Sequence, residues 1–200
     1  GVSGGANWGG MAFDPERRIA VVNQSRVANV MTLVPRESAA SVKPNPPLRS
    51  LFPQRGAPYA LQQEVLVSPL GIPCNPPPWG TLTGVDLDSG RVLWEVPLGT
   101  TRDRAPFPFW FDWGMPNLGG AIATGSGLVF IGATLDNYLR AFDIDNGREV
   151  WKARLPAGGQ ATPMTYRVGE SSRQFVVIAA GGHGGMGTTP GDSLVAFALP

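Results

Sequence analysis

The hydrophobic residues of this chain fall into short apolar runs separated by turn residues. Two stretches, residues 84–94 and 141–151, share one pattern: an apolar strand, an Asp, a tight turn with Gly, and a second strand ending in Trp. The tryptophans, Trp94 and Trp151, are 57 residues apart (151 − 94 = 57). A strand–turn–strand unit repeated at this period is typical of a β-propeller, whose blades bury one another's faces. The pattern therefore predicts an all-β, propeller-like fold.

Further apolar runs before and after the repeats extend this prediction, and no stretch has the periodicity of an amphipathic helix. Together they indicate three to four blades, some incomplete, whereas most propellers close with more. The chain is therefore predicted to be part of a propeller. The additional strands or strand pairs are expected at residues 9–34 (with a turn at 15–18), 30–34, 160–166, 174–180 and 194–198.

Two segments between the apolar runs are predicted to be loops. Residues 35–80 are rich in proline, and we expect little regular structure there. This segment is either a packed cap over a propeller face or a substrate contact, and the cap is the favoured interpretation. Residues 99–118 could line a pocket, stack on a ring, or anchor to a membrane or partner, but packing between blades is the more frequent role of such aromatics. Its aromatic residues are Phe107, Phe109, Trp110, Phe111 and Trp113.

Composition narrows the possible functions. The 200 residues are 42% hydrophobic and 16% charged, which is typical of a globular protein, and 27 Gly and 20 Pro suit a turn-rich β fold. A net charge of +1 gives no support for nucleic-acid binding. No apolar run reaches the roughly 20 residues that span a bilayer. The chain begins without Met, so we expect a piece of a longer or processed protein.

Few residues are candidates for a catalytic, metal-binding or ligand-binding role. His183, the only histidine, stands between glycine pairs after an apolar strand, and its role is either structural or at a ligand. With one histidine and one cysteine, Cys74, the sequence offers neither a His-rich metal site nor a Cys/His catalytic pair. Asp136 either closes its own turn, the favoured interpretation from the residues alone, or faces the propeller axis. Asn7 and Trp8 could bind and stack on a planar polar ring.

Several strings taken together resemble the C-terminal part of pyrroloquinoline quinone (PQQ)-dependent dehydrogenases of the membrane-bound glucose dehydrogenase type. The resemblance implies the last three to four blades of an eight-bladed propeller with the quinone on its axis. Such enzymes oxidise aldoses, polyols or cyclic hydroxy acids in the periplasm and pass electrons to ubiquinone. They reach the inner membrane through an N-terminal helical segment or a separate subunit, neither of which is visible here. The strings are residues 4–10, 68–80, 118–120, 132–143, 155–166 and 179–184.

The resemblance also implies roles for individual residues. Asn7, with Trp8 beside it, matches a pair that contacts the quinone, and Asp136 matches an acidic position near the cofactor, which reverses the preference for a turn role. His183 matches a histidine at the active-site mouth. The general base and the ligands of the divalent metal, calcium or magnesium, are expected upstream of this chain, so the chain alone is expected to be inactive.

The sequence leaves alternatives both for the substrate and for the functional class of the protein. Glucose is the first expectation, because residues 132–138 and 181–184 fit glucose-type relatives well, while polyol and quinate or shikimate enzymes share most of these strings. The alternative in a different class is a non-catalytic propeller scaffold that binds protein partners. A scaffold has no need of an axial polar ligand set, so Asn7, Trp8 and the run around His183 separate the two hypotheses.

Overall fold

The computed structural model describes residues 5–45, 48–169 and 173–198. These residues form an almost entirely β structure with two short 3-10 helices, η1 (Arg36–Ser41) and η2 (Gly184–Met186). In this described part, no helix is long and apolar enough to cross a membrane.

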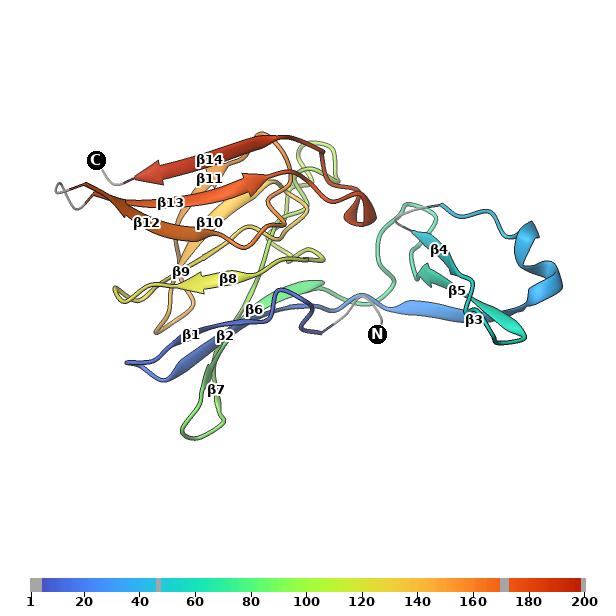
Figure 1. The fold of residues 1–200 in the computed structure, drawn as a ribbon, viewed down its shortest axis with the longest axis horizontal. Helices are drawn as coiled ribbons and strands as arrows, with labels where there is room; N and C mark the ends of the chain where they lie inside the picture. Colours follow the sequence, from blue (N-terminus) through green and yellow to red (C-terminus); the bar gives the residue numbers. More distant parts are fainter. Residues whose placement is uncertain (1–4, 46–47, 170–172, 199–200) are drawn as a thin grey trace.

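Three antiparallel meanders form a row of blade-like sheets, as Figure 1 shows. The first sheet has the order β1-β2-β6-β7, the second β8-β9-β10-β11 in chain order, and the third has the three strands β12-β13-β14. The predicted partial propeller with incomplete blades is thereby confirmed. The strands are β1 (Met11–Asp14), β2 (Ile19–Ser25), β6 (Gly80–Asp86), β7 (Val92–Pro97), β8 (Ala121–Ala123), β9 (Leu128–Ile131), β10 (Tyr138–Asp143), β11 (Glu149–Arg154), β12 (Met164–Val168), β13 (Arg173–Ala180) and β14 (Ser193–Ala198).

The two repeated turns have the same local construction. The Asp86 carboxylate accepts the backbone N–H groups of Asp88 and Ser89 at 2.7 and 3.1 Å, and the turn closes at Gly90 with φ +70°. In the second repeat, the Asp143 carboxylate accepts a backbone N–H at 2.9 Å, and Gly147 has φ +73°. Glycine adopts this left-handed backbone without a steric penalty. The aspartate of each repeat therefore has a structural role in closing its turn.

The repeated tryptophans link successive blades. Trp94 on β7 is 8% exposed, and its indole N–H donates at 2.7 Å to the carbonyl oxygen of Ile144, in the β10–β11 turn of the second sheet. Trp151 on β11 meets the ring of Phe197 on β14 edge-on, at 5.1 Å between centroids. Each tryptophan therefore joins its own sheet to the next, which explains why the pattern repeats once per blade.

The hydrophobic core lies between the sheets. The larger cluster fills the space between the first and second sheets, and the smaller one packs the second sheet against the third. Burial of these aliphatic side chains is the main stabilising contribution to the row of blades. The clusters include Val21, Leu82, Leu98, Val129, Ile131 and Phe142 in the first, and Leu139, Leu155 and Ile178 in the second.

The segment between β2 and β6 contradicts the prediction that residues 35–80 have little regular structure. A three-stranded antiparallel sheet of order β3-β5-β4 stands away from the blades (Figure 1). Its strands are β3 (Asn29–Pro35), β4 (Arg49–Phe52) and β5 (Tyr59–Val65). Pro35, Pro53 and Pro58 lie at strand ends or just outside, where no ladder hydrogen bond is lost. The strand at residues 30–34 was predicted correctly.

Candidate functional site

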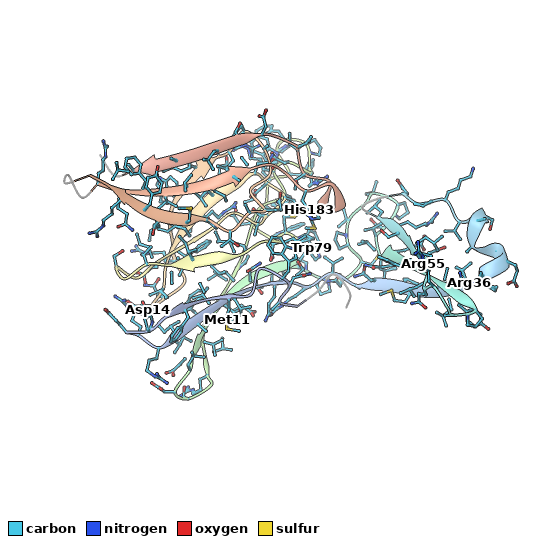
Figure 2. All side chains as sticks on the ribbon, viewed as in Figure 1. Met11, Asp14, Arg36, Arg55, Trp79 and His183 are labelled. Atoms are coloured by element: carbon cyan, nitrogen blue, oxygen red, sulfur yellow. The ribbon has the colours of Figure 1, made fainter. Side chains whose placement is uncertain are left out.

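All four predicted site residues lie at one end of the sheets. In an antiparallel meander, alternate connections share an end, so the segment before β1 and the β9–β10, β11–β12 and β13–β14 connections gather together. His183 and Trp79 lie toward this end in Figure 2, and Asp14 lies at the other. The inserted sheet also leaves the blades at the His183 end (Figure 1). We call it the site end of the molecule.

Asn7 and Trp8 form a turn just before β1. The backbone N–H of Trp8 donates to Asn7 Oδ1 at 2.8 Å, and the backbone N–H of Gly10 donates to the Asn7 carbonyl oxygen at 3.0 Å. The Trp8 side chain is 60% exposed. β1 is the edge strand of its sheet and packs beside β8, the edge strand of the next. First strands of propeller blades surround the central channel, so this indole lies on the axial side.

Asp136 is fully buried and holds its carboxylate in a complete set of hydrogen bonds. Oδ1 accepts Thr134 Oγ1 at 2.6 Å and Arg140 Nη1 at 3.0 Å. Oδ2 accepts the backbone N–H and the hydroxyl of Thr100, both at 2.8 Å, and pairs with Arg140 Nη2. The carboxylate therefore binds two nearby side chains, Thr134 and Arg140, and the distant Thr100, and it does not close its own turn through backbone N–H groups.

The buried ion pair controls the charge of Asp136. Burial by itself raises the pKa of Asp136, but the hydrogen bonds and positive charge of Arg140, with those of Thr134 and Thr100, outweigh it. The pKa of this carboxyl therefore lies below its ordinary value. Arg140 also donates Nε to Glu149 Oε2 at 3.0 Å, so each of its three guanidinium nitrogens donates a hydrogen bond. The sequence analysis missed Arg140, which is a buried arginine in a strand and has no motif of its own.

His183 is exposed in the connection between β13 and β14. Its turn is permitted by two glycines with left-handed backbone, Gly182 at φ +72° and Gly187 at φ +61°. The His183 backbone N–H donates to Thr188 Oγ1 at 2.8 Å, and that hydroxyl donates to Gln160 Oε1 at 2.9 Å. The imidazole is thus presented outward on a backbone that is anchored inward.

A chain of hydrogen bonds connects His183 with Asp136. Gln160 Nε2 donates to the Thr134 carbonyl oxygen at 2.9 Å, and Thr134 Oγ1 binds Asp136. Gln160 and Thr188 are both buried. Two of the predicted site residues therefore belong to one polar network. The sequence signals for it were the family-like strings at residues 132–143, 155–166 and 179–184, which contain Asp136, Gln160 and His183.

The glycine-rich strings at the site end allow neighbouring blades to touch through their backbones. A Cβ atom on Gly9 would lie 2.0 Å from the carbonyl oxygen of Gly119, and one on Gly132 would lie 2.3 Å from that of Gly159. At the second of these contacts, the Ala133 N–H donates to the Gly159 carbonyl oxygen at 2.7 Å. Any side chain at Gly9 or Gly132 would separate the blades, so these glycines position the site.

The loop at residues 99–118 keeps several of its aromatic rings exposed. The side chain of Phe107 is 76% exposed and that of Phe109 is 55% exposed. Trp113 stacks on Phe111 at 4.4 Å and meets Trp79 edge-on at 5.8 Å. Packing between blades, the more frequent role of such residues, therefore does not describe Phe107 and Phe109. We call residues 99–118 the aromatic loop.

Comparison with known proteins decides the family. The family described as "PQQ: Glucose/ethanol/alcohol dehydrogenase, beta-propeller domain" matches residues 1–176. The chain belongs to this PQQ β-propeller family.

Individual relatives agree with this family. The chain is 47% identical to "Quinoprotein glucose dehydrogenase A" of Acinetobacter calcoaceticus, over 96% of this chain and 24% of that protein. It is 41% identical to "Quinate/shikimate dehydrogenase (quinone)" of Acinetobacter baylyi, over 100% of this chain and 26% of that protein. The chain thus spans about a quarter of the length of these relatives. Among solved structures, a europium-containing methanol dehydrogenase matches 95% of this chain and 32% of its own, with TM-score 0.62 and 21% identity, a likeness of fold alone.

Asn7 and Trp8 suit the cofactor that gives the PQQ family its name. The exposed indole of Trp8 and the adjacent amide of Asn7 offer a flat face and a polar group on the axial side, which suits a planar polar ring. Within residues 5–45, 48–169 and 173–198, no three His, Cys, Asp or Glu side chains gather where they could hold a metal ion. That metal ligands lie outside this chain stays a prediction.

Proposed function

We propose that this chain supplies blades to a PQQ-dependent dehydrogenase that oxidises a sugar or polyol, with glucose as the first expected substrate, and passes electrons to ubiquinone. The observation that carries the proposal is 47% identity to a quinoprotein glucose dehydrogenase over 96% of the chain. The 41% identity to a quinate/shikimate enzyme keeps cyclic hydroxy acids as the alternative substrate class.

We assign roles at the axis from the exposure and placement of the side chains. Bound PQQ supplies the oxidising chemistry, since the cofactor accepts the hydride equivalent from the alcohol carbon. Trp8 and Asn7 contact and orient its ring system from the axial edge of the first sheet. Asp136 acts from beneath the surface, because its ion pair with Arg140 fixes the β9–β10 connection that faces the cofactor.

His183 lies at the mouth of the site and contacts substrate there. It is exposed, and the glycines around it leave room for a ligand beside the backbone. The general base and the calcium or magnesium ligands come from the rest of the propeller. The enzyme works in the periplasm and is attached to the inner membrane through a segment or subunit outside this chain.

The test uses the full-length polypeptide that carries this sequence. The apoprotein is loaded with PQQ and Ca²⁺ or Mg²⁺, and dye reduction is measured with glucose, glycerol and quinate, then with a soluble ubiquinone analogue. We expect PQQ-dependent turnover with the highest kcat/KM for glucose. Absence of PQQ binding would instead favour the non-catalytic scaffold, and a preference for quinate would correct the substrate. The 200 residues alone should bind no metal tightly and show no turnover.

The cofactor contact has its own test in the loaded enzyme. Trp8→Ala should weaken PQQ binding about tenfold or more, because a stacked aromatic face contributes roughly 1–3 kcal/mol. Leu70→Ala is the matched control, since Leu70 is an exposed apolar residue of the inserted segment at 85% exposure. Equal PQQ affinity in the two variants, measured by equilibrium titration, would remove Trp8 from the cofactor site.

A further inference from the structure

Arg104 connects the aromatic loop to the turn that presents His183. Its Nη2 atom donates to the carbonyl oxygens of Met186 and Gly187, at 3.1 and 2.6 Å. These carbonyls belong to the turn formed by η2 and its C-terminal glycine, directly after His183. A guanidinium donating to two backbone carbonyls is a charge-assisted contact, which is stronger than a neutral hydrogen bond.

The His183 turn has few other attachments. On its inner side, Thr188 and Gln160 hold the backbone of His183. On its outer side, the turn is exposed, contains Gly184 and Gly185, and closes on itself through the bond from Met186 N–H to the His183 carbonyl oxygen. A short glycine-rich 3-10 turn has little intrinsic stability. Arg104 therefore supplies the hydrogen bonds that hold this turn from the side of the aromatic loop.

The aromatic loop is itself fixed on the second sheet. Asp103 pairs with both carboxylate oxygens to Arg154 Nη2 at 2.7 Å, and Arg102 donates Nη1 to the Tyr138 hydroxyl at 3.0 Å. The Arg102 guanidinium also lies 4.6 Å from the centre of a Trp110 ring. The loop is thus a braced element, and within this chain its Phe107 and Phe109 side chains are left uncovered.

We propose that the aromatic loop is a second wall of the substrate entrance and that Arg104 is the positioning residue that holds this wall against the His183 turn. The proposal rests on the proposed function, because it assigns His183 to the mouth. The ligand class is a sugar: its C–H face packs on exposed aromatic rings such as Phe107, while its hydroxyls reach polar groups of the His183 turn. The aromatic loop then supplies the apolar contacts to the sugar, and the His183 turn supplies the polar contacts.

The test compares Arg104→Ala, Arg104→Lys and Arg91→Ala in the full-length protein. Arg91 is an exposed arginine in the β6–β7 turn at the opposite end and serves as the matched control. In the apoprotein, hydrogen exchange of a peptide covering residues 183–188 should be faster in Arg104→Ala than in Arg91→Ala. In the loaded enzyme, the KM for glucose should rise about three- to tenfold in Arg104→Ala with kcat within about twofold, because the turn loses its position but not its side chains. Arg104→Lys should restore part of both effects.

Phe107→Ala tests the wall without touching the His183 turn. It should raise the KM for glucose and leave hydrogen exchange at residues 183–188 unchanged. The positioning role would be overturned if hydrogen exchange at residues 183–188 were unchanged in Arg104→Ala. It would also be overturned if Arg104→Ala lost kcat and thermal stability while its KM stayed unchanged. An unchanged KM in Phe107→Ala would overturn the wall. Failure of the proposed function is distinct, because the unmodified protein would then neither bind PQQ nor turn over glucose.

Discussion

The two ends of the blades are held together in different ways. At the end opposite the site, the β6–β7 and β10–β11 turns are closed by side chains within three residues of the groups they bind, as in the contacts from Asp86. At the site end, polar contacts join distant segments: Asn23 Nδ2 donates to Asn117 Oδ1 across 94 residues at 2.7 Å. The opposite end also has contacts between distant segments, such as the ion pair of Arg18 with Asp88, but its turns are closed by local bonds. At the site end, the β9–β10 and β13–β14 connections are themselves held by bonds from distant segments. Asp136 and His183, to which we assign roles, lie in these connections.

The largest effect should come from removing the buried carboxylate. Asp136→Ala leaves the guanidinium of Arg140 buried without its main partner, and breaking a buried ion pair in this way costs about 3–5 kcal/mol. The free energy of unfolding of the full-length protein, measured in urea, should fall by that amount. Asp136→Ala combined with Arg140→Met should recover part of the loss. If the double variant is no more stable than the single one, the penalty does not arise from the unpaired charge.

The same ion pair predicts a dependence of stability on pH. The pKa of Asp136 is lowered in the folded protein, so its contribution is present above the pKa of the unfolded chain, about 3.9. The contribution is lost as the pH falls below that value through the lower pKa of the folded state. The difference in unfolding free energy between the wild type and Asp136→Ala should therefore shrink below about pH 4. A difference that stays constant down to pH 3 would contradict this account.

A smaller effect is expected from the backbone contact between blades. In Gly132→Ala the new Cβ atom would meet the Gly159 carbonyl oxygen at 2.3 Å, and such overpacking costs about 1–3 kcal/mol. Gly125→Ala is the control, because a Cβ atom at Gly125 would have no neighbour within 4 Å. Thermal unfolding should separate the two variants, and PQQ affinity should fall only in Gly132→Ala. Equal melting temperatures of Gly132→Ala and Gly125→Ala would show that a Cβ atom at residue 132 does not destabilise the packing between blades.

The blades were predicted from the sequence more completely than the inserted sheet and the site residues, because blade strands and turns depend on local sequence. The blade strands and the repeated Asp–Gly turns follow from apolar runs and turn chemistry, so most of their positions were predicted correctly. The strand expected at residues 160–166 is β12, which starts only at Met164. The inserted sheet was missed at β4 and β5, because its strands pair across the proline-rich segment and no local pattern specifies the pairing. Asn7, Trp8, Asp136 and His183 were named with the help of a family resemblance, and their roles stay proposals.

The residues that support the site were not predictable from spacing. Arg104 reaches carbonyl groups 82 and 83 residues away, and Thr188 binds Gln160 across 28 residues. Such partners are brought together only by the arrangement of three blades. A sequence pattern can show that a glycine-rich turn surrounds His183, but it cannot show which side chain holds that turn.

The smallest effect should come from the turn at the opposite end. Asp86→Ala removes two short-range hydrogen bonds to backbone N–H groups that solvent can replace, since the turn is exposed. Loss of a comparable side-chain cap costs about 0.5–2 kcal/mol, and we expect the lower part of that range. PQQ affinity and the KM for glucose should match the wild type. A fall in PQQ affinity would show that the two ends are coupled through the blades, and the distinction between local and assembled structure would then fail for function.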